Sequence, residues 1–383
     1  MKTLFVIFVL LCTANMVWAQ DDEYFVDLIK KGEYRTNTID VNRDNTQLLI
    51  GAENKLVAVY DLASKKTVFE VQAHYQPVIS VKFSAVENTF YSVGDRSIKL
   101  WKIGGEKPEK IYTGTHTNIT SCDYTPGEFF FVASSYDKKY RYWDASQLKA
   151  IKTVETGHKK SIIAVAISND NKLVATGALD SSIEIWHTDS AVRKHLMLAH
   201  SRPISCLEFV NKNNHIISAS HDGNARLWDA ETGEPIKMYL GHTEPISSIE
   251  VRPDGKYLLM ASFDHTIGLF NIATGEKIHT YVYHEFPVLD VAWNTKGDGF
   301  YSCDKEGNII EWSVPDKVFV DFYFGKEIGT EITASKLVLP RKKGEPKDGF
   351  KARKARAEKL KSQLRDKYYL KYLELQKTFV IGN

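Results

Sequence analysis

Residue types that could perform acyl transfer lie close together near the middle of the chain. His200, Ser218 and Asp222 fall within one short stretch, and a serine, a histidine and an aspartate can serve as nucleophile, base and orienting carboxylate of a hydrolase. The same residue types recur at matching places along the chain, usually with a tryptophan behind them. A catalytic group is needed only once, so the recurrence predicts hydrogen-bonded supports inside a repeated unit and no enzyme.

The histidines alone could also suggest a metal site. Six of them recur every 42 residues: His74, His116, His158, His200, His242 and His284. Zinc ligands must all lie ~2 Å from one ion, whereas residues that occur once per repeat lie in separate units. The chain also lacks the spacing of a calcium loop and of a phosphate-binding loop. We therefore expect neither a metal nor another cofactor.

A fixed period runs through most of the chain and indicates a repeat architecture. A bulky aromatic closes each of seven units: Tyr60, Trp101, Trp143, Trp186, Trp228, Phe270 and Trp312. An aspartate lies six residues before this aromatic in five units: Asp95, Asp137, Asp180, Asp222 and Asp264. The first and last units carry Asn54 and Glu306 there. Apolar residues alternate with polar ones inside each unit, which predicts short β-strands joined by tight turns.

The pairs Gly241-His242, Asp222-Gly223 and Trp228-Asp229, repeated at this period, closely resemble the motifs of the WD-repeat β-propeller family. The resemblance covers about residues 24–325. It implies an all-β fold of seven blades, each an antiparallel sheet of four strands packed on its neighbours. It also implies structural roles for the recurring histidines, aspartates and tryptophans. For the first unit we expect strands near 36–41, 47–51, 55–61 and 66–71.

Two segments could supply the outermost strand of the last blade and so close the ring. One is the N-terminal segment 25–29, and the other is segment 318–324, which directly follows the seventh unit. Closure by the N-terminal segment ties the two chain ends together and removes an exposed sheet edge. We therefore favour the N-terminal strand and expect segment 318–324 to form an extra strand or to pack over the bottom of the ring.

Two positions of each unit line the wider face around the central channel in WD-repeat proteins. The resemblance implies a partner-binding role for six residues at these positions: Tyr136, Leu179, Arg202, His221, Phe263 and Phe286. Aromatic and arginine side chains are typical of interaction hot spots. We expect a non-enzymatic scaffold that binds protein partners and is itself monomeric within a complex. The alternative is a secreted propeller enzyme or small-ligand binder that uses the central channel.

The first 19 residues have the pattern of a secretory signal peptide. Lys2 precedes a short apolar run, and Val17-Trp18-Ala19 forms a small-residue cleavage site before Gln20. The apolar run is shorter than the ~20 residues that a membrane-spanning helix needs. This pattern predicts export to the periplasm or beyond the cell. We expect the cysteines of units three, five and seven to remain unpaired, because disulfides require Cα atoms within ~7 Å.

The C-terminal part differs in composition from the repeats. We expect a linker over 326–347, which contains glycines and prolines, and a basic amphipathic helix over 348–383. Segment 341–377 holds 14 Lys and Arg against 5 Asp and Glu, although the whole chain has a formal net charge of only +2.

The predicted helix has an apolar stripe that includes Leu364, Tyr368 and Tyr372, which we expect to bind a partner. Three surfaces could bind this stripe: the surface of the propeller, a groove of a partner protein, or an anionic envelope surface. We expect no nucleic-acid partner, because an exported protein rarely meets nucleic acid.

Overall fold

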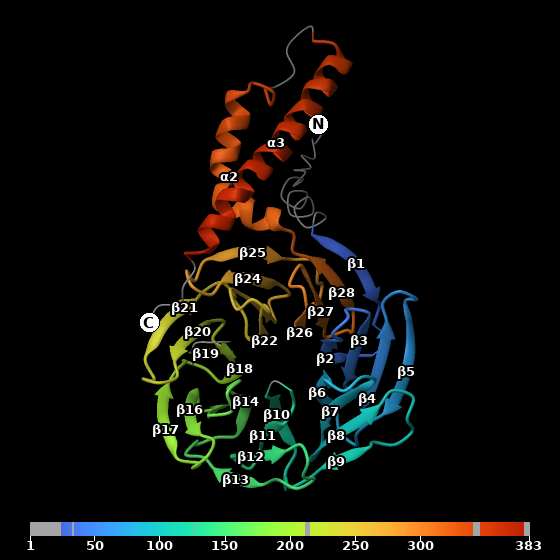
Figure 1. The fold of residues 1–383 in the computed structure, drawn as a ribbon, viewed down its shortest axis with the longest axis vertical. Coiled ribbons are helices and arrows are strands. Elements are labelled where there is room, and N and C mark those ends of the chain that lie inside the picture. The colour runs from blue at the N-terminus through green and yellow to red at the C-terminus, as the bar shows by residue number, and fades with distance from the viewer. Residues whose placement is uncertain (1–23, 33, 126, 211–214, 340–344, 379–383) are drawn as a thin grey trace, which may run out of the picture.

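The structure is a computed structural model that describes residues 24–378, apart from 33, 126, 211–214 and 340–344. The predicted signal peptide over 1–19 lies outside the described residues. Seven four-stranded antiparallel sheets stand around a common axis as the blades of a propeller, and two helices follow the last blade (Figure 1). This confirms the predicted seven-bladed all-β fold with a C-terminal helix.

Blades 1 to 6 each contain four consecutive strands, numbered from the ring axis outward. Blades 1 to 3 comprise β2 (Thr36–Val41), β3 (Gln47–Ala52), β4 (Leu56–Asp61), β5 (Lys66–Gln72); β6 (Val78–Phe83), β7 (Thr89–Gly94), β8 (Ser97–Lys102), β9 (Lys110–Tyr112); and β10 (Ile119–Tyr124), β11 (Phe130–Ser135), β12 (Lys139–Asp144), β13 (Lys152–Glu155). Blades 4 to 6 comprise β14 (Ile162–Ile167), β15 (Leu173–Ala178), β16 (Ser182–His187), β17 (Arg193–Leu198); β18 (Ile204–Val210), β19 (His215–Ser220), β20 (Ala225–Asp229), β21 (Pro235–Tyr239); and β22 (Ile246–Val251), β23 (Tyr257–Ser262), β24 (Ile267–Asn271), β25 (Lys277–Tyr281).

The strands predicted for the first unit are confirmed as β2 to β5. The second strand of each blade is almost wholly buried because both of its faces pack on neighbouring blades. The first strand of every blade shows the same register shift near its start, as between Val78 and Ser80 in β6. Such a bulge increases the local twist of a strand, so a regular twist recurs around the ring.

Blade 7 is closed by the N-terminal strand, as predicted. It comprises β26 (Val288–Trp293), β27 (Gly299–Asp304), β28 (Ile309–Ser313) and β1 (Phe25–Lys30), and β1 pairs antiparallel with β28. The chain then passes very close to the β27–β28 turn: a Cβ on Gly32 would lie 1.7 Å from the carbonyl oxygen of Glu306. Only glycine fits this approach, and the outer edge of β28 is covered.

The segment after blade 7 differs from the sequence prediction. Segment 318–324 forms no strand but lies in helix α2 (Asp316–Ala334), so the predicted linker over 326–347 is wrong in its first part. A second helix, α3 (Lys347–Gln376), follows. Val318, Phe319 and Val320 are all buried, which a helix seated on the ring permits and a strand with one exposed face does not. The edge of β28 was already taken by β1.

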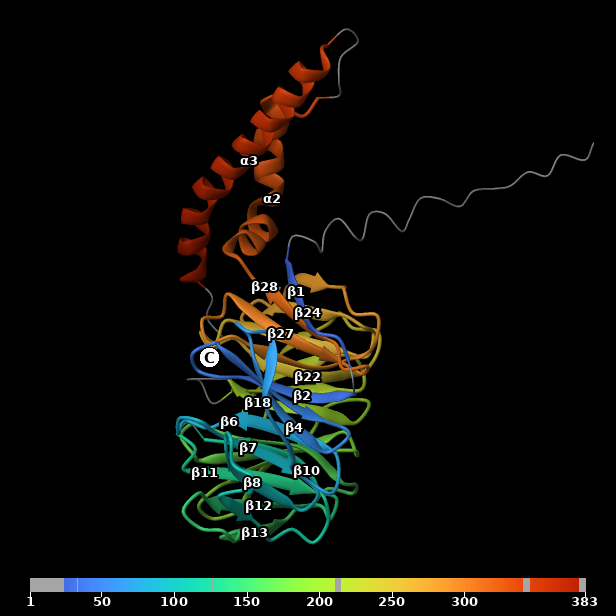
Figure 2. The same ribbon diagram turned by 90° about the vertical axis from the view of Figure 1, so that its right-hand side faces the viewer.

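The two helices form an antiparallel hairpin that projects from the edge of the ring beside blades 6 and 7 (Figures 1 and 2). At its base, the Tyr372 and Tyr257 hydroxyls are 2.8 Å apart, and the Tyr372 ring stacks on Phe319 at 5.5 Å between centroids. Asn271 of β24 donates a hydrogen bond to the Tyr323 hydroxyl at 2.9 Å. No helix in the described part of the chain is long and apolar enough to cross a bilayer.

Candidate interaction site

The recurring Ser, His and Asp form a hydrogen-bonded strut inside a blade. In blade 5, Trp228 Nε1 donates to Ser218 Oγ at 2.9 Å, Ser218 Oγ lies 2.8 Å from His200 Nε2, and His200 Nδ1 lies 2.9 Å from Asp222 Oδ2. Because tryptophan only donates and an ionised carboxylate only accepts, the direction of the whole chain is fixed. The serine proton is therefore directed at a structural partner, and no nucleophile is left free.

The aspartate of the strut also holds the turn that follows it. Asp222 accepts hydrogen bonds from the backbone N–H groups of Ser201 and Asn224. Burial acts to raise the pKa of Asp222, but the hydrogen bonds from His200 and from these amides outweigh it and lower the pKa to about 2. The carboxylate is therefore ionised at neutral pH. Blade 2 repeats this strut with His74, Ser92, Asp95 and Trp101.

Blade 7 has the strut as well, but with a different acid from the one that the spacing indicated. His284 Nδ1 lies 3.0 Å from Asp304 Oδ2, while Trp312 donates to Ser302 at 2.7 Å. Glu306, which occupies the aspartate position by sequence spacing, is exposed. In the turn of this blade, Asp304 accepts the backbone N–H groups of Glu306 and Asn308. The acid of the strut therefore lies two residues before the position that the spacing indicated.

We expect Asp304→Ala to destabilise the protein by roughly 2–3 kcal/mol, because it leaves His284, two turn amides and the Asn308 side chain without their acceptor. Glu306→Ala should change stability by less than about 0.5 kcal/mol, as is usual for an exposed side chain. Thermal or urea unfolding of both variants measures the difference. Equal losses would contradict the assignment of the strut to Asp304.

The strut prediction is wrong for His116 in blade 3. His116 is exposed, and Asp137 instead binds Arg141, whose Nη2 donates at 2.6 Å to Asp137 Oδ2. Arg141 is 1% exposed and also donates to Ser135 Oγ at 2.7 Å. Trp143 accordingly donates to the carbonyl of Thr113. The buried guanidinium makes the contact with the aspartate that the histidine ring makes in other blades.

Blade 6 keeps only part of the strut. His242 Nδ1 lies 2.9 Å from Asp264 Oδ2. Met260 and Phe270 stand where other blades have a serine and a tryptophan; the thioether of Met260 is only a weak acceptor, and Phe270 has no donor. His242 Nε2 is consequently without a hydrogen-bond partner among the described residues.

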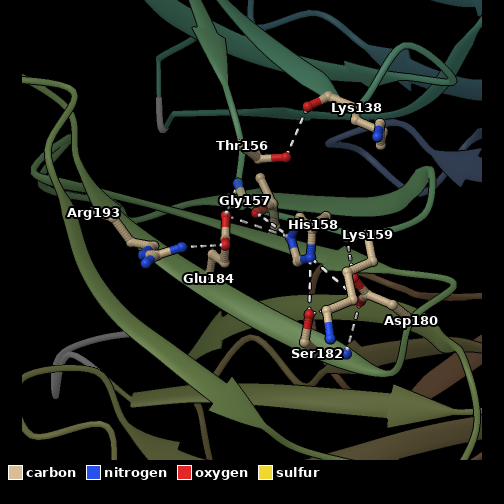
Figure 3. Close-up of polar contacts among 10 residues, drawn as sticks. Lys138, Thr156, Gly157, His158, Lys159, Asp180, Ser182, Glu184 and Arg193 are labelled. Carbon is tan, nitrogen blue, oxygen red and sulfur yellow. Dashed lines mark hydrogen bonds and ion pairs between the residues drawn. The ribbon is translucent and has the colours of Figure 1, made fainter.

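Blade 4 has a strut in which serine and threonine hydroxyls contact the histidine (Figure 3). His158 lies 2.9 Å from both Ser182 Oγ and Thr176 Oγ1, and Ser182 in turn donates to Asp180. Trp186 Nε1 has no hydrogen-bond partner within the described structure. His158 thus reaches its aspartate mainly through a serine hydroxyl.

Glu184 of β16 lies beside this strut and is completely buried. Its Oε1 accepts a hydrogen bond from Arg193 Nη1 at 2.7 Å, and its Oε2 accepts the backbone N–H of Gly157 at 3.0 Å (Figure 3). A buried carboxylate is tolerated when it is paired and hydrogen-bonded. Arg193 comes from the outermost strand, so this ion pair joins β17 to the interior of the blade.

One face of the ring presents the partner-binding positions predicted from the family. Tyr136, Phe263 and Phe286 are 56%, 42% and 38% exposed, and Arg202 is exposed as well. Leu179 and His221 are half-buried. The backbone N–H of Tyr136 donates to the carbonyl of Asn118, just before β10, and that of His221 donates to the carbonyl of Pro203, just before β18. The two positions of a blade that were predicted to bind partners therefore lie side by side. We call the turns that carry these residues the rim.

The rim is basic over blades 2 to 5. Five exposed basic side chains occur there, none of them in an ion pair with another described residue: Arg96, Lys138, Lys159, Lys160 and Arg202. The aspartates in the same turns accept hydrogen bonds from groups of their own blades. The sequence analysis did not single out Tyr75, which follows His74 on this rim and is 83% exposed.

The apolar stripe of α3 does not face a partner. Leu364, Tyr368 and Tyr372 are only 6%, 5% and 0% exposed, because they pack against α2 and blade 6 in one cluster. Of the three binding surfaces that the sequence left open for the stripe, the stripe packs against the one on its own chain. The prediction that these three side chains bind another molecule is therefore wrong.

A set of carboxylates around the ring axis was missed by the sequence analysis. Each accepts a hydrogen bond from a backbone N–H of the next blade: Asp40 from Phe83, Asp123 from Ile167, Glu208 from Val251, Glu250 from Trp293 and Asp290 from Ile39. The last of these joins blade 7 to blade 1. A charged residue recurs at the repeat period near the end of five first strands (Asp40, Lys82, Asp123, Glu208 and Glu250), and this signal could have revealed all but Asp290, which lies two residues earlier in its strand.

Burial of these groups shifts their titration. It raises the pKa of Glu208 to about 8 and that of Asp40 to about 6, and it also raises the pKa of Glu250 well above its usual value. Burial acts to lower the pKa of Lys82, yet Asp40 and other nearby acids raise it overall. The Lys82 ammonium group therefore lies among several acids, of which Glu208 is mostly protonated at neutral pH.

We expect the stability of the protein to fall as pH rises from about 5 to 8. Glu208 holds its proton more tightly in the folded chain than in the unfolded one, so its favourable contribution is complete at acidic pH and is lost as the pH passes the folded pKa. Glu208→Gln should flatten this dependence by roughly 1–3 kcal/mol, whereas Glu234→Gln, at an exposed site, should not. Urea unfolding across this pH range provides the measurement, and parallel profiles would contradict the assignment.

No group of three His, Cys, Asp or Glu side chains in the described ranges is arranged to hold a metal ion. Cys122, Cys206 and Cys303 are free thiols. Burial raises the pKa of Cys122 and of Cys206 to about 12, which suppresses the thiolate that reacts as a nucleophile.

Comparison with known proteins identifies the repeat and several partial relatives. The family model described as "WD domain, G-beta repeat" matches residues 65–102, 106–144, 149–187, 192–229, 233–271 and 275–313, which together exceed half of the chain. E3 ubiquitin-protein ligase COP1 of Arabidopsis thaliana is 28% identical over 134 residues, 34% of this chain and 20% of that protein. Apoptotic protease-activating factor 1 of Rattus norvegicus is 27% identical over 158 residues, 41% of this chain and 12% of that protein. The similarity thus spans a small part of each relative.

Proposed function

Because the chain belongs to the WD-repeat family, we propose that it is a non-enzymatic scaffold whose rim binds a protein partner. The observation that carries the proposal is the rim itself, which presents exposed aromatic side chains on blades 2, 3, 6 and 7 and unpaired basic ones on blades 2 to 5. Aromatic and arginine side chains supply much of the binding energy in protein interfaces. The serine, histidine and aspartate sets are bound to one another inside the blades, so they serve the fold.

The charge of the rim indicates the chemistry of the partner. Blades 2 to 5 present the five basic side chains together with Tyr75 and Tyr136, whereas blades 6 and 7 present Glu244 and Glu285 beside Phe263 and Phe286. Complementary charge steers association and fixes orientation. We therefore propose that an acidic segment of the partner lies over blades 2 to 5 and that an apolar segment contacts blades 6 and 7.

Site-specific photo-crosslinking tests this proposal. A photoreactive phenylalanine analogue at position 136 or 263 should give one crosslinked species in the native host, and the same analogue at Val68, exposed on the outer strand β5, should not. Lys138→Glu with Lys160→Glu should reduce the crosslink at least tenfold. Lys107→Glu with Lys110→Glu, an equal charge change on the outside of blade 2, should leave it intact. Equal yields from position 68, or equal loss in both charge variants, would overturn the proposal.

We also propose that the chain is exported. Support comes from residues 1–19, in which Lys2, a short apolar run and the Val17-Trp18-Ala19 site follow one another. Intact-mass measurement of the protein purified from its host should show a chain that begins at Gln20 in the extracytoplasmic fraction. A full-length mass in the cytosolic fraction would contradict export.

A further inference from the structure

The far end of the α2–α3 hairpin is the part of the described chain that projects furthest from the ring (Figure 2). After α2 the chain presents Val338 and Leu339, which are 50% and 39% exposed. Two adjacent exposed apolar side chains at a protruding end are unusual beside an otherwise polar segment. We call Lys336, Val338, Leu339 and the first two turns of α3 the hairpin tip.

Arg353 holds the apolar pair in place. Its Nη1 donates to the carbonyl oxygens of Leu337 at 3.0 Å and Leu339 at 2.6 Å, and its Nε and Nη2 bind the Glu345 carboxylate at 3.1 and 2.9 Å. A guanidinium with two backbone acceptors and one bidentate acid is a geometrically specific anchor. Val338 and Leu339 are therefore displayed from a backbone that is fixed to α3.

Basic side chains surround this apolar pair. Lys347, Lys351 and Lys354 have the i, i+4, i+7 spacing that places them on one face of α3, and Lys336 lies on the same end of the hairpin. All four are exposed and form no ion pair with any residue that the structure describes. The exposed Asp348 lies in the same first turn but is about 100° around the helix from Lys347, and the first acid on the lysine face is Glu358, one turn beyond Lys354.

Nearer the base of the hairpin, two cations of α3 are paired with acids of α2. Arg365 binds Asp321, and Lys367 binds Glu331 at 2.8 Å. Burial of Leu364 and Tyr372 at this end already accounts for how the hairpin is seated on the ring. Leu370 and Leu373 of α3 are also exposed nearer the base, but only at the tip do exposed apolar side chains project away from the ring together with the unpaired Lys336, Lys347, Lys351 and Lys354.

We propose that the hairpin tip docks on an anionic lipid bilayer. Exposed apolar side chains flanked by lysines are the combination that binds a membrane surface, the former by partial insertion and the latter through anionic headgroups. A protruding tip can contact the flat surface of a bilayer without a complementary groove. A nucleic-acid duplex would engage the lysines but offers no counterpart for Val338 and Leu339. Neither helix spans the bilayer, so the attachment is peripheral.

The attachment would hold the ring at a distance from the membrane. α3 contains 30 residues, which corresponds to about 45 Å at 1.5 Å per residue. Because the hairpin leaves the ring at its edge (Figure 1), the ring stands on its side and both faces remain open. The rim can then bind a partner while the tip is on the lipid.

Vesicle co-sedimentation of the full mature chain tests the proposal. Wild-type protein should bind vesicles of phosphatidylglycerol and phosphatidylcholine in equal parts and should not bind phosphatidylcholine alone. Lys351→Glu with Lys354→Glu should weaken binding at least tenfold, since each cation near an anionic surface contributes a factor of about five. Val338→Ser with Leu339→Ser should weaken it several-fold, and this loss should persist at high salt. Lys107→Glu with Lys110→Glu, on blade 2, should bind like the wild type.

Three outcomes would overturn membrane docking by the tip. They are equal binding to both vesicle types, an equal loss in the blade 2 control, and a tip variant that binds vesicles as the wild type does. Binding of a DNA duplex that the tip variant loses, without any vesicle binding, would likewise overturn it and assign the surface to nucleic acid. Matching thermal melts of all variants ensure that a loss reports on the surface.

Discussion

Arg193→Ala is expected to lower the free energy of unfolding by about 2–4 kcal/mol, although Arg193 itself is partly exposed. The substitution leaves Glu184, which is 0% exposed, with the N–H of Gly157 but without its cation. Removing one partner of a buried ion pair is costly because the remaining charge stays desolvated. Urea unfolding of the variant and the wild type gives the difference directly.

A double-mutant cycle separates this effect from lost packing. Glu184→Gln combined with Arg193→Ala should be more stable than Arg193→Ala alone, because no unpaired charge is then buried. Lys139→Ala is the matched control in the neighbouring blade: its partner Glu155 lies 3.5 Å away and is largely exposed, so the cost should be below about 1 kcal/mol. A similar cost for Lys139→Ala and Arg193→Ala would contradict the buried-charge explanation.

Leu364→Asp should release the α2–α3 hairpin from its seat while leaving the blades folded. Leu364 is 6% exposed within the cluster that joins both helices to blade 6. Truncating a buried leucine typically costs about 2–5 kcal/mol, and an unpaired carboxylate adds to this. Limited trypsin digestion followed by mass measurement should show rapid cleavage of the basic helix and a protected propeller.

Lys361→Ala is the control for this variant, because it removes one charge from the same turn of α3 without opening the apolar cluster. Its digestion should proceed like that of the wild type. Equal cleavage of the Leu364 and Lys361 variants, or release of the hairpin by high salt alone, would mean that charge rather than apolar burial seats the hairpin.

The repeat itself could be predicted because its signals are local and recur. The positions of His200, Asp222 and Trp228 indicate a blade in any one unit, and seven aromatic closers give the number of blades. The closing strand β1 was predictable for a different reason: an open sheet edge is unfavourable, and only one segment precedes the first blade.

Segment 318–324 shows where sequence patterns were insufficient. Its β-branched and aromatic residues are typical of a strand, and the later Gly329 and Pro340 suggest a linker. Both preferences are weak beside the burial of Phe319 against Tyr257, whose rings lie 4.5 Å apart. Tertiary packing overrides local propensity, and such packing depends on residues about 60 positions away in sequence.

The site predictions were wrong where a residue at the expected position bonds to a different partner from the one that the repeat pattern indicates. His116 occurs at the correct period, yet Arg141 takes over its contact with Asp137, which spacing alone does not reveal. The carboxylates around the ring axis were missed because each bonds to the backbone of a neighbouring blade, as Asp290 does with Ile39. The recurring acids are visible in the sequence, but their partners are backbone N–H groups, which leave no residue pattern of their own.

Hydrogen–deuterium exchange of the chain, alone and with the partner recovered by crosslinking, tests the central claim most directly. If the rim is the binding surface, the partner should slow exchange in the turns at 136–138, 158–160, 202–203 and 263–264. The outer strands β5 and β17 and the hairpin tip should exchange at unchanged rates. Protection confined to the outer strands or to the hairpin, with none in the rim turns, would contradict the claim.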